Sequence, residues 1–264
     1  MELNTATIIP LHKEKFKYAI EALISFHKHS SNENLYFIFS NIKEYKYFCS
    51  LTDLSYKYLI VPSNMDLSIN PINKKKFYGL DYLFSKGFNL VGVLDCEVLF
   101  VNSFNSKKLY KNIFNRSYFK SNQSTKGSSI IKYIATKLNV ANNPHLISQT
   151  NNYTQYWWFN EICVYEKDLF LEFSKWVFSL NNFKDIISDP ICFDYLLYSI
   201  WLIVFKNYNL KLIDPLNTYE FGALEHNFLS KETSLKFNSY IDAYSLPDIP
   251  HHIIIQIHSD RTHE

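Results

Sequence analysis

The sequence predicts an α/β fold in which helices flank a mainly parallel sheet. Short runs rich in β-branched and aromatic residues alternate with segments whose apolar residues recur at helical spacing. The 264 residues are 47% hydrophobic and only 20% charged, which is enough apolar material for a buried core. With only 5 glycines, the chain is not collagen-like or a Gly-rich linker. The length fits one domain.

The first hundred residues contain alternating strand and helix patterns. Strands are predicted at residues 5–11 (TATIIPL), 35–39 (LYFIF), 56–61 (YKYLIV) and 89–101 (NLVGVLDCEVLFV). Helices are predicted at residues 16–26 and 74–84, the second with Phe77, Leu80 and Phe84 on one face. Such alternation implies parallel neighbours joined by crossovers.

The remainder of the chain changes character twice. Between residues 120 and 155 the composition turns to Ser, Asn, Gln and Thr, with a helix expected only at 130–138. Order then returns. Strands are expected at 156–165, 210–213 and 252–258, and helices at 169–180 and 193–205.

Charge and cysteine content exclude several partner classes. The net charge is only +2 and the single tight basic run is Lys74 to Lys76, so no nucleic-acid partner is expected. The four cysteines have no CxxC spacing, which indicates neither zinc nor a disulfide framework and favours a reducing compartment. Residues 1–10 do not resemble a secretory signal, and the apolar run at 196–205 is half the roughly 20 residues that span a bilayer. A cytoplasmic location is therefore expected.

Two acids, Asp95 and Glu97, interrupt the most apolar predicted strand. On an extended chain their side chains point to the same side, about 6–7 Å apart. A hard divalent cation such as Mn²⁺ or Mg²⁺ can bridge two carboxylates and leave positions for water and phosphate. In open α/β sheets, ligands bind beyond the carboxyl ends of the strands, where this pair is expected. The alternative is that the strand ends at Leu94 and the acids are solvated turn residues.

These features resemble the nucleotide-sugar-dependent glycosyltransferases of the GT-A fold, with its Rossmann-like sheet. The matching parts are residues 7–12 (TIIPLH), the helix at 74–84 and residues 94–100 (LDCEVLF), where Glu97 replaces the second Asp of a D-x-D motif. The resemblance implies a metal-dependent transfer of sugar from a nucleotide-diphosphate donor to a hydroxyl of a glycan or lipid-linked acceptor. It also implies surface polysaccharide or lipooligosaccharide synthesis, a Mn²⁺ or Mg²⁺ cofactor, and peripheral contact with the cytoplasmic membrane face.

The resemblance divides the single domain of residues 1–264 into three parts. Residues 1–101 would bind the nucleotide sugar, residues 102–155 would form a flexible insertion or lid, and residues 156–264 would form the acceptor half. Donor-binding candidates are the loop Pro10, Leu11 and His12, the lysines Lys74 and Lys75, and Asp95. A plain loop histidine and solvated lysines at a helix start are the alternatives.

The acceptor half supplies candidates for the metal and for catalysis. His258, after the last predicted strand, would be a third metal ligand beside Asp95 and Glu97, or else a polar residue of the tail. Asp194 stands at the start of a predicted helix and would be the catalytic base, with Asp189 as second choice. A helix cap is the alternative for Asp194.

Acceptor binding is expected at the segment 156–161. Trp157 and Trp158 offer flat faces for sugar rings, and Asn160 and Glu161 can bond to hydroxyls. Adjacent residues of a strand face opposite sides, so one of the two tryptophans is expected in the core.

Two other function classes remain open. The replacement at Glu97 allows a non-catalytic glycan-binding or scaffold protein on a degenerate transferase fold. A sugar-phosphate nucleotidyltransferase ranks lower, because residues 1–78 contain no glycine and so no Gly-rich phosphate loop.

Overall fold

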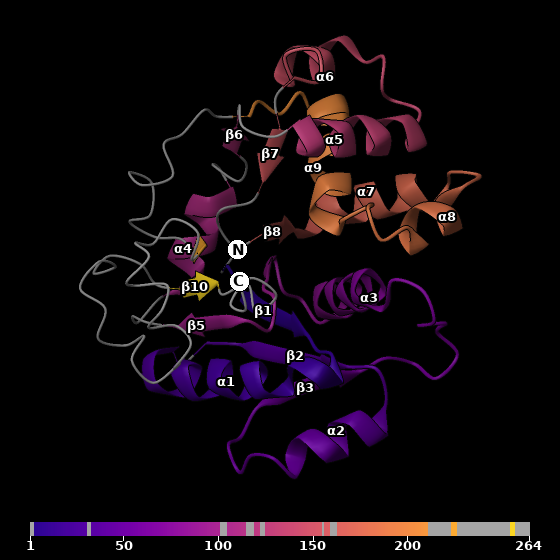
Figure 1. Cartoon of the computed structure of the whole chain (residues 1–264). Helices are drawn as coiled ribbons and strands as arrows, with labels where there is room; N and C mark the ends of the chain where they lie inside the picture. Colours follow the sequence, from indigo (N-terminus) through magenta and orange to yellow (C-terminus); the bar gives the residue numbers. More distant parts are fainter. Residues whose placement is uncertain are drawn as a thin grey trace.

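The structure, a computed structural model, describes residues 3–30, 33–100, 105–114, 119–121, 125–154, 156–158, 163–210, 223–225 and 254–256 (Figure 1). The strands are β1 (Thr5–Pro10), β2 (Leu35–Phe39), β3 (Lys57–Ile60), β4 (Leu90–Val93), β5 (Val98–Phe100), β6 (Phe119–Ser121), β7 (Tyr156–Trp158), β8 (Cys163–Glu166), β9 (Ala223–Glu225) and β10 (Ile254–Gln256). The helices are the short 3₁₀ turn η1 (Lys13–Lys15), α1 (Phe16–Ser30), α2 (Ile42–Cys49), α3 (Pro71–Ser85), α4 (Ser106–Phe114), α5 (Thr125–Lys137), α6 (Pro144–Gln149), α7 (Lys167–Phe178), α8 (Phe183–Ser188) and α9 (Asp194–Lys206).

A five-stranded sheet forms the centre of the described chain, in the order β3-β2-β1-β4-β8. The first four strands are mutually parallel, and β8 pairs antiparallel with β4 at the edge. In register, Ile8 lies opposite Tyr36 on one side and Val93 on the other. The predicted α/β class with a mainly parallel sheet and flanking helices is confirmed.

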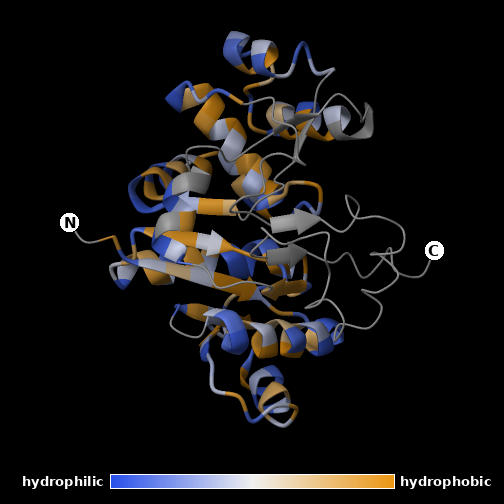
Figure 2. Ribbon diagram, turned by 90° about the vertical axis from the view of Figure 1, so that its left-hand side faces the viewer, coloured by the Kyte–Doolittle hydropathy of each residue, from blue (hydrophilic) through white to orange (hydrophobic). Residues whose placement is uncertain are grey.

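The two faces of this sheet contact two separate hydrophobic cores. Along β1, Ala6 and Ile8 join the core under α3, α7 and α9, whereas Ile9 and the following Leu11 join the core under α1 and α2. This alternation is the two-residue period of a strand that is buried on both faces. Figure 2 shows the consequence: the central strands are largely hydrophobic, while the outer helices are banded with hydrophilic residues.

Boundary differences from the predicted elements have local causes. Helix α3 begins at Pro71 rather than at residue 74, because the side chain of Asn70 caps it and proline suits the first helical position. The predicted strand at 89–101 is two strands, β4 and β5, which are separated by a turn at residues 94–97. The predicted strand at 156–165 also divides, into β7 and β8.

The segment at 102–155, expected as a flexible insertion or lid, contains more helix than its sequence predicts. Its described residues include α4, α5 and α6, and α5 begins at Thr125 rather than at residue 130. The core under α3, α7 and α9 also contains the buried side chains of Ile131, Ile134 and Leu138. This burial explains why a segment rich in Ser and Asn is ordered there. Residues 211–213 of a further predicted strand lie outside the described residues.

Helix α9 confirms the predicted apolar helix. Residues 194–203 are all buried, as expected for a helix that is hydrophobic around its circumference. Within the described ranges, every helix is too short or too polar to cross a membrane.

The packing of α3 on the sheet depends on Gly79, and this gives a first prediction. A Cβ atom at Gly79 would overlap Cδ1 of Ile38 and come within 3.1 Å of Cδ1 of Ile8. We expect Gly79→Ala to lower the free energy of unfolding by about 1–2 kcal/mol, because overpacking outweighs the better helix propensity of alanine. Ile38→Val removes the overlapping atom, so the double variant should be more stable than the sum of the two single changes predicts. Urea denaturation measures this, and simple additivity would contradict the contact.

Candidate active site

The strand order places a switch point between β1 and β4. From β1 the chain proceeds outward through β2 and β3, then returns to β4 on the other side of β1. Leu94 N donates to Ile8 O (3.0 Å) and Leu11 N donates to Ile38 O (2.9 Å), so the chain leaves both strands at the same edge of the sheet. Ligands of open α/β folds bind in the crevice at such a switch point.

Asp95 and Glu97 follow β4 at this edge, but in a turn rather than on a strand. The strand ends at Val93, so the extended backbone that was expected to aim both carboxylates the same way is wrong. Neither acid is simply solvated. Lys15 Nζ donates to Glu97 Oε1 at 2.6 Å, and Asp95 Oδ1 lies 3.8 Å from Lys76 Nζ. The Glu97 side chain is 12% exposed and that of Asp95 is 39% exposed, which makes Asp95 the more accessible carboxylate.

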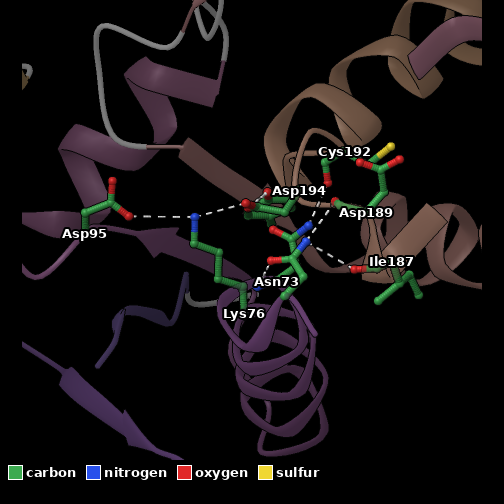
Figure 3. Close-up of polar contacts among 9 residues, drawn as sticks. Asn73, Lys76, Asp95, Ile187, Asp189, Cys192 and Asp194 are labelled. Atoms are coloured by element: carbon green, nitrogen blue, oxygen red, sulfur yellow. Dashed lines mark hydrogen bonds and ion pairs between the residues drawn. The ribbon is translucent and has the colours of Figure 1, made fainter. Parts of the chain in front are cut away.

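Lys76 connects the turn after β4 to the start of α9. Its Nζ donates to Asp194 Oδ1 at 2.9 Å, and Figure 3 shows its side chain lying between Asp95 and Asp194. Tyr165 OH donates to the other oxygen of Asp194 at 2.5 Å. Burial alone would lower the pKa of Lys76, but the carboxylates of Asp194 and Asp95 outweigh it and raise the pKa above its usual value. Lys76 therefore remains a buried cation that faces Asp95.

The three consecutive lysines of α3 have different surroundings. Lys74 Nζ lies 3.9 Å from Asp66 Oδ2, and Lys75 Nζ, fully buried, donates to Leu11 O and lies 3.9 Å from Glu44 Oε2. Sequence reasoning named these two as donor contacts and missed Lys76. Helical spacing could have identified Lys76 in the sequence. It stands four residues before Leu80, so the two side chains lie on the same, buried face of the helix.

The loop after β1 provides one polar candidate side chain. Pro10 ends the strand, and Leu11 is fully buried, with its N–H bonded to Ile38 O and its carbonyl accepting a bond from Lys75 Nζ. His12 is half-buried, and its pKa is lowered by burial and then by the charge of Lys75. A neutral imidazole at pH 7 follows.

Asp189, the second catalytic candidate, bonds to a different part of the fold. Its carboxylate accepts bonds from Lys137 Nζ (2.7 Å), Tyr133 OH (2.6 Å) and Ile191 N (2.9 Å). Burial acts to raise its pKa, but the bond from Lys137 and the other donors hold the pKa below its usual value. These contacts attach the α8–α9 connection to α5, and they do not reach the turn after β4.

Asn73 and Asn70 hold the same connection to α3. Asn73 Nδ2 donates to Cys192 O at 2.6 Å (Figure 3). Asn70 Nδ2 donates to the carbonyls of Ile187 (3.2 Å) and Asp189 (3.0 Å). The first turn of α3 thus fixes the chain just before α9, and with it the position of Asp194.

The structure does not describe the side chains of several residues that the sequence predicts for the site. His258, Asn160 and Glu161 lie outside the described residues. Trp157 and Trp158 belong to β7, which pairs antiparallel with β6, and only their backbone is described. The metal and acceptor assignments of these residues stay predictions.

The carboxylates fit a divalent cation by their donor chemistry. Asp95 offers a partly exposed hard oxygen ligand, whereas Glu97 can serve only after it leaves Lys15. In the part of the chain that the structure describes, no three His, Cys, Asp or Glu side chains gather as a metal site.

No protein-family model and no curated protein matches the chain. Among solved structures it is similar to core-mannan synthase A from Aspergillus fumigatus in its Mn/GDP form, with 13% identity, a TM-score of 0.38 and 75% of this chain covered. The chain spans 66% of the length of that protein. It is also similar to a glycosyltransferase involved in glycosylation of the major capsid of PBCV-1, with 12% identity, a TM-score of 0.45 and 96% and 92% of the two chains covered.

A third similar structure is the galactosyltransferase LgtC in complex with donor and acceptor sugar analogs, with 11% identity, a TM-score of 0.44 and 96% and 86% of the two chains covered. The second and third are named as glycosyltransferases, the class that the sequence resembles. With TM-scores below 0.5, these likenesses carry no conclusion about the chemistry of this chain.

The buried ion pair gives a second prediction. Lys76→Met leaves the carboxylate of Asp194 buried without its cation, and we expect a loss of about 3–5 kcal/mol in the free energy of unfolding. Adding Asp194→Asn removes the unpaired buried charge, so the double variant should recover part of the lost free energy of unfolding. Urea denaturation measures both, with the exposed Lys184→Met on α8 as control. Equal losses at Lys76 and Lys184 would contradict the pairing.

Proposed function

We propose that this chain is a glycosyltransferase that binds a nucleotide-diphosphate sugar at the carboxyl edge of β1 and β4. In this proposal it transfers the sugar to a hydroxyl of a glycan or lipid-linked acceptor. One observation supports it most: Lys76 lies between Asp95 and Asp194 at the switch point of the sheet. Its hydrogen bond to Asp194 joins two residues that are 118 positions apart in the sequence. Burying a cation is costly unless it is paired, and Lys76 is paired with both carboxylates. Coupled buried charges of this kind are common at functional sites.

Two lysines at this edge would meet an anionic donor. Lys15 pairs with Glu97, and Lys76 lies beside Asp95, so each would be shared between its carboxylate and the donor. Lys75 is buried and donates to Leu11 O. Charges act more strongly at a partly buried site than in bulk water, because the effective dielectric constant is lower. Lysines placed in this way would stabilise negative charge on the leaving diphosphate.

We assign the proposed cation, Mn²⁺ or Mg²⁺, to Asp95 first, with Glu97 and His258 as further ligands. When bound, such a cation supplies positive charge next to a diphosphate. The protein positions the carboxylate of Asp95 for this role, because the ammonium group of Lys76 on α3 lies beside it.

The contacts of Asp194 support a positioning role more than that of a free base. Both carboxylate oxygens are bonded, one to Lys76 and one to Tyr165, and the residue is 2% exposed. Asp194 thereby holds the ammonium group of Lys76 toward Asp95. The contacts of Asp189 support a structural role, since they join the α8–α9 connection to α5.

One observation favours a second candidate, a non-catalytic nucleotide- or glycan-binding protein on the same fold. Asp95 and Glu97 each have a lysine beside them. In a binding site that has lost its metal, lysines would neutralise the carboxylates in this way. Nucleotide binding without turnover would distinguish this candidate from the enzyme.

A third prediction concerns donor binding. UDP, GDP or CMP at 100 times its dissociation constant should stabilise the folded chain by about 2.7 kcal/mol, which thermal unfolding with and without Mn²⁺ detects. We expect one of the three nucleotides to stabilise the chain, and Asp95→Ala to abolish the part that needs Mn²⁺. The exposed Asp53→Ala is the matched control. A chain that none of the nucleotides stabilises would contradict a donor site.

A fourth prediction concerns turnover. Asp95→Ala together with Glu97→Ala should reduce metal-dependent hydrolysis of the nucleotide sugar at least about 100-fold, because charge on the leaving diphosphate loses its stabilisation. Release of the nucleotide diphosphate measures this. Hydrolysis at the wild-type rate in the double variant would rule out the proposed site.

A further inference from the structure

Helices α7 and α9 border an open depression, which we name the α7–α9 groove. It has a volume of about 430 Å³ and is open to solvent over most of its extent. Its lining residues are Glu172, Lys175, Trp176, Ser179, Trp201, Phe205 and Lys206. The groove uses the C-terminal end of α9, whereas Asp194 of the candidate active site is at the N-terminal end of the same helix.

Three aromatic side chains form the apolar part of the α7–α9 groove. The ring centroids of Trp176 and Phe205 are 5.0 Å apart, and those of Trp201 and Phe205 are 6.3 Å apart. Trp201 is anchored in the core, whereas Phe205 remains 47% exposed. The groove thus offers an aromatic surface in which Trp201 is held by the core and the ring of Phe205 is accessible to a ligand.

The polar groups of the groove carry a net positive charge. Lys206 Nζ pairs with Glu172 Oε2 at 2.5 Å and lies 5.3 Å from the centroid of Trp201. Within the described ranges Lys175 forms no ion pair, so its ammonium group is the unbalanced charge of this groove. The hydroxyl of Ser179 lies at the same rim, where it donates to Trp176 O at 2.7 Å and can still accept a hydrogen bond.

From this combination we infer that the α7–α9 groove binds an acidic saccharide. One face of a pyranose ring presents C–H groups that pack on an aromatic ring, and its edge presents hydroxyls for polar side chains. A carboxylate on the sugar would meet the ammonium group of Lys175. This site is separate from the proposed donor site, and its existence does not depend on glycosyl transfer.

Isothermal titration calorimetry with trigalacturonate and neutral galactotriose tests the inference. We expect the wild-type chain to bind trigalacturonate about two to five times more tightly than galactotriose, the range that one exposed charge pair gives. Lys175→Ala should remove this difference, while Lys184→Ala on α8 should leave it unchanged. Phe205→Ala and Trp176→Ala should weaken binding of both sugars about tenfold. Because Phe205 is exposed, its removal should not disturb folding.

Tetraglutamate and an aromatic control complete the test. Tyr47→Ala removes an exposed aromatic residue on α2, far along the chain, and should have no effect. Failure of trigalacturonate to bind, unchanged affinity in Phe205→Ala, or equally tight binding of tetraglutamate would each overturn the inference. Stabilisation by nucleotide should be the same in every groove variant, so a negative result here leaves the donor-site proposal untouched.

Discussion

The buried ion pair between Lys76 and Asp194 is the interaction on which the candidate active site depends. It joins α3 to α9, and the hydroxyl of Tyr165 adds β8 by donating to the second oxygen of Asp194. Through Lys76 the same group reaches Asp95 in the turn after β4. Desolvation of two charges costs several kcal/mol, so this arrangement persists only because each carboxylate oxygen of Asp194 has a donor.

Stability alone does not account for such a pair. Apolar residues of similar volume often replace buried ion pairs without loss, and the surrounding core would accommodate them. An apolar residue at position 76 would, however, remove the ammonium group that lies 3.8 Å from Asp95 Oδ1. The pair is therefore best explained by what it does at the edge of the sheet: it keeps a positive charge at a fixed place beside an accessible carboxylate.

Local patterns predicted the sheet well and the contacts of the site poorly. Strands β1, β2 and β3 are found within a residue or two of their predicted ends, because β-branched and aromatic runs bounded by polar residues are a local signal. The position of Asp95 after β4 was also predictable. Its pairing with Lys76 was not, nor was that of Lys76 with Asp194, since partners 118 residues apart meet only through tertiary packing. The helix predicted at 130–138 is α5, but the polar composition concealed its first residues, which begin at Thr125.

Helix α9 contributes residues to both sites and fixes the distance between them. Its residues 194–203 are buried on all sides, so the helix has no exposed face along which it can shift without opening the core. Asp194 and Lys206 are twelve residues apart, which corresponds to about 18 Å along a helix that rises 1.5 Å per residue. A ligand in the α7–α9 groove would contact one end of this rigid element, and the other end holds Lys76 toward Asp95. The separation of groove and active site is thus fixed by the core rather than by loops.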